Sequence, residues 1–285
     1  MKKIQFAMLS ILTLGLTACS SSSTEEAIND GPTKAVKFTL KGDFAAATFK
    51  GTMSADGSDL TDLWVFDYLD GTLAQQLHQS PTDADWGQPT LNLAYGTHSI
   101  FFVASRGKEP SVDADAGTII WGTPSDTFWE PTQVTVSSTS AANRTVTLMR
   151  VATRLRLTVL DEVPANIASV TISPSRWYYG LNFTTGNPVA SKAQERTIAV
   201  PASFAGTSGN LVLSIFGLSS SDEWAADVNV TATATDGTTL GAVTITGAPF
   251  KANRSTEYSG NLFAASGTTD INLATTWEAP RTATW

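Results

Sequence analysis

The sequence predicts an all-β protein made of two tandem antiparallel β-sandwich domains. Apolar and polar residues alternate with period two along most of the chain, and glycine, proline, asparagine or aspartate interrupts nearly every gap between these runs. No segment carries a sustained apolar stripe at helical spacing. Only 15% of the 285 residues are charged, against roughly 25% in ordinary soluble domains, whereas threonine and tryptophan, which suit pleated surfaces, are abundant.

The predicted strands follow one another along the chain. Val36, Phe38 and Leu40 alternate with lysine and threonine and predict the first strand, and residues 64–68 predict the second, which leads into a hairpin signal at Asp70-Gly71. Further strands are predicted around residues 73–77, 100–104, 134–136, 146–148, 155–159, 170–172, 198–200, 211–215, 228–234, 243–245 and 271–273. One sandwich needs about seven strands, and there are candidates for roughly two sandwiches.

We place the two domains at residues 34–150 and 151–285. The boundary at Arg150 separates an alternating run that would close one sandwich from a run, 152–160, that would open the next. No proline- or serine-rich linker occurs there, so we expect the domains to be closely apposed. A single larger domain is the alternative. Residues 270–277 predict either a closing strand or an element presented to a partner.

The N-terminus carries an export and attachment signal. Two lysines precede an apolar stretch over residues 4–15, and Leu-Thr-Ala-Cys19 follows at once, which is typical of a bacterial lipobox. We therefore expect a lipoprotein signal peptide at 1–18, a diacylglycerol and acyl (palmitate) lipid on Cys19, a polar flexible tether over 19–33, and an outer-membrane location. An ordinary signal peptide is the alternative. Cys19 is the only cysteine, so no intrachain disulfide can form.

Charge and residue inventory exclude several function classes. Signal-peptide cleavage would leave 18 − 2 = 16 basic against 26 acidic residues, a net charge of −10, which is opposite to what nucleic-acid binding requires. We expect no metal and no cofactor other than the lipid. Two histidines, His78 and His98, leave little for a metal site, and we interpret both as structural.

No catalytic signature stands out. Ser105-Arg-Gly-Lys108 fits a Ser-x-x-Lys nucleophile pattern, but it follows an apolar strand instead of opening the helix that the pattern needs. Asp83/Asp85 and Asp113/Asp115 lack the rest of a calcium loop, and we interpret them as turn residues. We therefore predict that the protein is not an enzyme.

Three consecutive aromatic residues form a candidate ligand surface. Trp177, Tyr178 and Tyr179 point to alternate faces of a strand, so a two-layer core can cover only one of the faces. They suggest an alternative function, a surface glycan-binding lipoprotein that uses exposed aromatic rings. Packing between domains or subunits is the competing interpretation.

Several segments resemble the fimbrillin-type (type V pilus) subunit and anchor lipoproteins. These segments are residues 62–71, 75–79, 95–107, 176–181 and 247–258. The resemblance implies two transthyretin-like sandwiches and a role in surface fimbriae. In that family a trypsin-like protease cuts behind the first strand of an exported subunit, and a strand from a neighbouring subunit fills the groove. The corresponding partner-strand segment here is Val36, Phe38 and Leu40.

One departure from the family scheme bears on the role. The first arginine of the chain is Arg106, so an arginine-specific protease could not release the first strand, and only four lysines occupy the region between Cys19 and position 105. We therefore expect the lipid to stay attached and the protein to be an anchor or basal subunit. Its expected partners are other fimbrial subunits, the lipid of the outer membrane, and ligands on host or bacterial surfaces.

Overall fold

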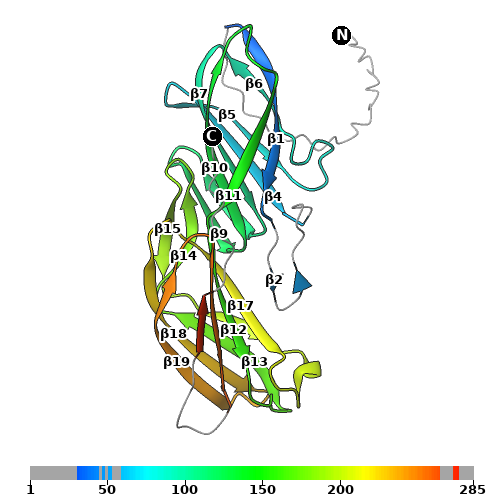
Figure 1. Ribbon diagram of the computed structural model, residues 1–285, viewed down its shortest axis with the longest axis vertical. Helices are drawn as coiled ribbons and strands as arrows, with labels where there is room; N and C mark the ends of the chain where they lie inside the picture. Colours follow the sequence, from blue (N-terminus) through cyan, green and yellow to red (C-terminus); the bar gives the residue numbers. More distant parts are fainter. Residues whose placement is uncertain (1–30, 45–46, 49–50, 53–58, 264–271, 276–285) are drawn as a thin grey trace, which may run out of the picture.

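The computed structural model describes residues 31–44, 47–48, 51–52, 59–263 and 272–275, and it is an elongated molecule built almost entirely of strands (Figure 1). The predicted signal peptide and Cys19 lie outside the described residues. Within the described part, the one helical element is the 3-10 turn η1 (Ala202–Phe204). No described helix is long and apolar enough to cross a membrane. The prediction of an all-β fold with packed sheets is confirmed.

The N-terminal half of the chain forms one seven-stranded sheet in the order β5-β4-β7-β10-β11-β1-β6. These strands are β1 (Thr33–Gly42), β4 (Asp62–Leu69), β5 (Thr72–Gln79), β6 (Thr90–Ala94), β7 (Gly96–Ser105), β10 (Thr127–Val136) and β11 (Asn143–Arg150). Nε2 of Gln75 on β5 donates a hydrogen bond to the carbonyl of Asn92 on β6 (3.2 Å), so the two edge strands come together and the sheet curls around its own core. A separate two-stranded ribbon consists of β2 (Ala47–Thr48) and β3 (Gly51–Thr52).

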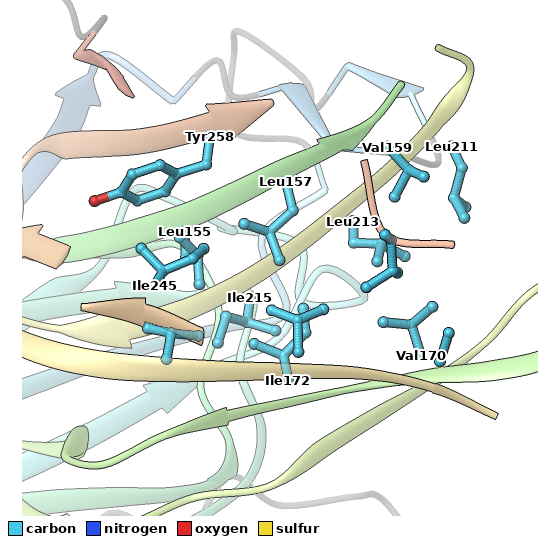
Figure 2. Packing of buried hydrophobic residues seen from close by; sticks show 14 of the residues in the cluster. Leu155, Leu157, Val159, Val170, Ile172, Leu211, Leu213, Ile215, Ile245 and Tyr258 are labelled. Atoms are coloured by element: carbon cyan, nitrogen blue, oxygen red, sulfur yellow. The ribbon is translucent and has the colours of Figure 1, made fainter. Parts of the chain in front are cut away.

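The C-terminal half contains two four-stranded sheets. One has the order β17-β12-β20-β21, and the other has the order β16-β13-β18-β19. Their strands are β12 (Ala152–Val159), β13 (Ile167–Pro174), β16 (Arg196–Ala199), β17 (Leu211–Leu218), β18 (Trp224–Ala234), β19 (Thr239–Phe250), β20 (Arg254–Gly260) and β21 (Asn272–Thr275). Figure 2 shows aliphatic side chains from both sheets, such as Leu157 and Ile172, meeting in the layer between them. One face of each sheet is therefore buried, as the alternation of apolar and polar residues predicts.

A fourth sheet joins the two halves. Its order is β15-β14-β9-β8, where β8 (Lys108–Asp113) and β9 (Thr118–Thr123) come from the N-terminal half, and β14 (Trp177–Asn182) and β15 (Asn187–Lys192) from the C-terminal half. Each hairpin interrupts the sequence between two strands that pair with each other, β7 with β10 and β13 with β16. The ladder between β9 and β14 sets Ile119 opposite Leu181. We call this the junction sheet.

The junction sheet packs on the outer face of the N-terminal sheet. Phe66, Phe101 and Val103 of the N-terminal sheet form one cluster with Ile119 and Trp121 of β9 and with Leu181 and Phe183 of the C-terminal half. The rings of Phe66 and Phe183 stack with centroids 3.8 Å apart. The halves therefore share a hydrophobic core. The junction sheet contains strands from both sides of the domain boundary predicted at Arg150. Whether the halves are separate domains stays a prediction.

Two strand pairs differ from the predicted antiparallel arrangement. β1 pairs with β11 in parallel, and β12 pairs with β20 in parallel, so in each half the first strand lies beside a strand near the end of that half. The alternation of apolar and polar residues indicates which face of a strand is buried. It is the same in parallel and antiparallel pairs, so the sequence pattern could not distinguish the two kinds of pairing. At the C-terminus, β21 pairs with β20 at the edge of its sheet, in agreement with a closing strand.

Candidate functional site

The predicted partner-strand segment lies inside the N-terminal sheet. β1 is bordered by β11 on one side and β6 on the other, and Val36 and Phe38 are fully buried while Leu40 is half-buried. Within the described chain this segment already has backbone partners on both sides. Its role in pairing with another subunit stays a prediction.

Trp177 corrects the predicted aromatic surface. Its side chain is 0% exposed, and its Nε1 donates a hydrogen bond to the carbonyl of Phe216 (2.9 Å). Trp224 and Phe250 pack on it edge to face at centroid distances of 5.9 and 4.9 Å. The prediction was wrong at this position because aromatic residues from β18 and β19 cover the strand face that sequence alone left open. Ligand binding by the rings of Tyr178 and Tyr179 stays a prediction.

Tyr178 and Tyr179 are half-buried and do not form a continuous platform. The guanidinium of Arg176 lies 5.5 Å from the ring of Tyr178 and 5.2 Å from that of Trp224, and the ammonium of Lys192 lies 4.8 Å from the ring of Tyr179. Both tyrosine rings therefore have cationic neighbours within the chain.

Both histidines have partners within the protein. His98 is buried, with Nδ1 2.7 Å from Oδ1 of Asp67 and Nε2 2.9 Å from the carbonyl of Ala94. Burial raises the pKa of the Asp67 carboxyl, although its contacts with Gln75 and His98 act against this rise. His78 lies 2.8 Å from Asp62 and is partly exposed.

The candidate catalytic serine takes part in a structural contact. Oγ of Ser105 is buried, lies 2.9 Å from the hydroxyl of Thr127, and accepts a hydrogen bond from the backbone N–H of Gly107. Lys108 is exposed at the start of β8. Among the described residues, no group of three or more histidine, cysteine or acidic side chains could hold a metal ion.

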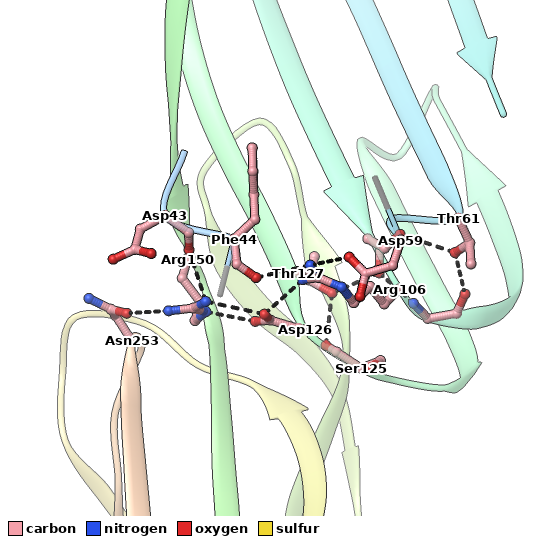
Figure 3. A network of polar contacts seen from close by, with 12 residues as sticks. Asp43, Phe44, Asp59, Thr61, Arg106, Ser125, Asp126, Thr127, Arg150 and Asn253 are labelled. Atoms are coloured by element: carbon pink, nitrogen blue, oxygen red, sulfur yellow. Dashed lines mark hydrogen bonds and ion pairs between the residues drawn. The ribbon is translucent and has the colours of Figure 1, made fainter. Parts of the chain in front are cut away.

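Buried charges gather where the two halves meet (Figure 3). Asp126 is fully buried and accepts hydrogen bonds from Nε of Arg150 (2.7 Å) and Nη1 of Arg106 (3.0 Å). Arg150 also donates to Oδ1 of Asn253 in the C-terminal half (3.2 Å), and Arg106 also donates to Asp59 (2.6 Å). Burial raises the pKa of the Asp126 carboxyl, and the guanidinium groups of Arg150 and Arg106 act in the opposite direction. At the domain boundary predicted at Arg150, a network of buried charges therefore links the two halves.

Beside this network lies an open cleft of about 720 Å³, which we call the junction cleft. Its walls come from both halves: β10, the end of β11, and three turns of the C-terminal half. The lining residues are Trp129, Met149, Arg150, Val151, Thr185, Gly186, Asn187, Ser219, Ser220, Ser221, Lys251, Ala252, Asn253 and Arg254. Sequence reasoning missed this site, because its polar residues lie in turns far apart in the chain. The one available signal in the sequence was the large aromatic residue Trp129.

Comparisons with known proteins identify the fold. No protein-family model and no curated protein matches the sequence. Among solved structures, a candidate adhesin from Bacteroides ovatus matches with a TM-score of 0.55 and 10% identity over 90% of this chain and 99% of its own. A candidate polysaccharide-binding protein from Bacteroides thetaiotaomicron matches with a TM-score of 0.53 and 8% identity, over 87% of this chain and 99% of its own.

Fimbrial proteins are among the matching structures as well. A fimbrial assembly protein from Parabacteroides distasonis matches with a TM-score of 0.49 and 11% identity, over 87% of this chain and 100% of its own. The matching structures thus include a protein named as a candidate adhesin and one named as a fimbrial assembly protein. At these identities the similarity to the Bacteroides structures shows a shared fold.

Proposed function

We propose that this protein is a lipid-anchored component of surface fimbriae, acting in assembly or adhesion as an anchor or basal subunit at the outer membrane. The observation that carries the proposal is the fold: almost the whole chain superposes on almost the whole of a candidate adhesin. Fold alone does not determine function. The sequence features that follow make the proposal more specific.

The lipid anchor rests on the sequence around Cys19. The cysteine stands directly after an apolar stretch of signal-peptide length, and the residues behind it are serine, threonine and glutamate, which suit a solvated tether. The first described strand, β1, begins at Thr33, the last residue of the tether predicted over residues 19–33. A chain of this length lets the folded part stand clear of the membrane surface.

The anchor role rests on the absence of a release site. No arginine precedes Arg106, and Arg106 itself is only 7% exposed and bonded to Asp126 and Asp59. A protease needs an accessible, locally unfolded backbone, and a buried, ion-paired side chain does not offer one. The lipid would therefore remain joined to β1 and the folded protein.

Partner subunits would bind at strand edges. The junction sheet ends in β8 on one side and β15 on the other, and short edge strands are natural points for main-chain pairing with another subunit. Such a role requires no catalytic group, in line with the structural contacts that occupy Ser105 and the histidines.

The test is the N-terminus of the protein recovered from cells. We expect fatty-acid label on the wild-type protein, an N-terminal peptide that starts at lipidated Cys19, and loss of the label in Cys19→Ser. We also expect co-purification with a polymerising fimbrial subunit, and fimbriae shed into the medium when the chain is deleted. Recovery of an unlipidated protein that starts after Lys50 would overturn the anchor role.

A further inference from the structure

The junction cleft combines the groups that recognise a saccharide. Trp129 supplies an aromatic ring, on which the C–H face of a sugar ring can stack. Asn187, Asn253 and the hydroxyls of Ser220 and Ser221 supply donors and acceptors at short spacing, as the hydroxyl groups of a sugar require. The cleft volume of about 720 Å³ lies within the usual range of ligand sites, roughly 300–1,000 Å³.

The aromatic ring is held in a fixed orientation. Nε1 of Trp129 donates a hydrogen bond to the carbonyl of Phe183 (2.7 Å). Gly186 packs against the six-membered ring so closely that an added Cβ would lie 2.6 Å from Cζ3, and its φ of +74° also favours glycine. Because the ring is already positioned, a ligand would not have to bear the cost of ordering it.

The charges in the cleft favour an acidic ligand. The chain carries a net charge of −8, yet the three charged residues that line the cleft are all basic: Arg150, Lys251 and Arg254. Arg150 is paired with Asp126 behind the cleft, and Arg254 is paired with Glu223 outside its lining. Within the described residues Lys251 makes no hydrogen bond or ion pair. A basic concavity on an acidic protein concentrates anionic ligands.

We propose that the junction cleft binds an acidic saccharide, a sugar chain with at least one carboxylate, by stacking on Trp129 and pairing with Lys251. This site is distinct from the aromatic segment at 177–179, whose first ring is buried. The inference goes beyond the proposed role in fimbriae and does not depend on it, because both halves of the isolated chain supply the cleft.

The experiment titrates the purified full chain, in detergent, with sugars of defined charge. The acidic probes are trigalacturonate and 3′-sialyllactose, and their neutral counterparts are methyl-esterified trigalacturonate and lactose. We expect submillimolar binding of at least one acidic probe, a change in tryptophan fluorescence, and at least tenfold weaker binding of the neutral counterpart.

Variants place the binding in the cleft. Lys251 is partly exposed and Asn187 is exposed in the cleft. We expect Lys251→Glu and Asn187→Ala each to lower the affinity for the acidic probe at least fivefold. Lys192→Glu makes the same charge reversal at a residue that does not line the cleft, and it should leave the affinity unchanged. Circular dichroism confirms that each variant is folded.

Three results would overturn the proposal. These are no binding of either acidic probe by the wild-type chain, equal affinity in Lys251→Glu and Lys192→Glu, or full competition by millimolar inorganic phosphate, which would indicate a simple anion site. Lipidation and fimbrial assembly are measured separately in cells, so either proposal can fail while the other stands.

Discussion

The two halves of the chain close their sheets alike but build their cores differently. In both, the first strand pairs in parallel with a late strand, β1 with β11 and β12 with β20. The N-terminal half curls one sheet around a core rich in phenylalanine, including Phe38, Phe102 and Phe128, whereas the C-terminal half stacks two sheets on valine, leucine and isoleucine. One connection pattern therefore accommodates either a single curled sheet or a pair of stacked sheets.

The halves also differ in where they place buried charge. The N-terminal half contains the His98–Asp67 pair and the Arg106–Asp126–Arg150 network, in which both aspartates are fully buried. In the C-terminal half, Arg154 pairs with Glu257, whose side chain remains 19% exposed. The two fully buried aspartates therefore lie in the N-terminal half. The Arg106–Asp126–Arg150 network lies where the two halves meet.

The largest expected effect comes from Asp126→Ala. The substitution leaves the guanidinium groups of Arg106 and Arg150 buried without their shared carboxylate, which costs about 3–5 kcal/mol in the free energy of unfolding. Chemical denaturation measures this loss. Asp115→Ala, which removes an exposed carboxylate, should change stability by less than about 0.5 kcal/mol. Equal effects of the two substitutions would mean that the network does not support the joint.

Phe183→Ala should separate the halves. Phe183 is fully buried against Phe66, and its truncation costs about 3 kcal/mol, concentrated where the junction sheet meets the N-terminal sheet. We expect native-state hydrogen exchange to show one opening unit in the wild type and two in the variant. Phe102→Ala, inside the N-terminal core, should cost as much yet leave the halves coupled. Two opening units in both variants would contradict the coupling role of Phe183.

Asp67→Asn should alter how stability depends on pH. The Ala94 carbonyl can only accept a hydrogen bond, so Nε2 of His98 carries a hydrogen. The contact between Nδ1 of His98 and Oδ1 of Asp67 needs a second proton between these two atoms. Because burial raises the pKa of Asp67 in the folded state, its contribution to stability is complete below about pH 3.8 and is lost as pH rises through the folded pKa.

An asparagine at position 67 resembles the protonated carboxyl and does not titrate. The free energy of unfolding of the variant, relative to the wild type, should therefore rise between pH 4 and pH 7. Denaturant unfolding at several pH values measures the difference. Asp62→Asn, at the partly exposed His78 pair, serves as the control. A constant difference across this range would mean that Asp67 stays ionised.

The smallest effect compares two matched threonine pairs. Thr97 and Thr135 face each other across β7 and β10 with hydroxyls 3.1 Å apart, and Thr171 and Thr197 do so across β13 and β16 at 3.0 Å. Double-mutant cycles to alanine should give coupling energies of about 0.2–1 kcal/mol, and similar values in the two halves. A value near zero in one half alone would indicate a looser sheet there.

Much of the fold could be predicted from local pattern, and most of the candidate site could not. Alternation in Val36, Phe38 and Leu40 correctly identified β1 because burial of one face has a local signature. The pairing of β9 with β14 has no local signature in the sequence, because it depends on two hairpins that lie about sixty residues apart. Trp177 shows the same limit, because Phe250 and Trp224 decide its burial.

The parallel closure of each half has a kinetic consequence. Lys37 on β1 lies opposite Asn143 on β11, so the first strand cannot take its final place until about a hundred further residues are available. Folds dominated by such distant pairings form slowly, on the scale of milliseconds to seconds. During synthesis, the edge of β1 that faces β11 therefore stays unpaired until β11 has left the ribosome.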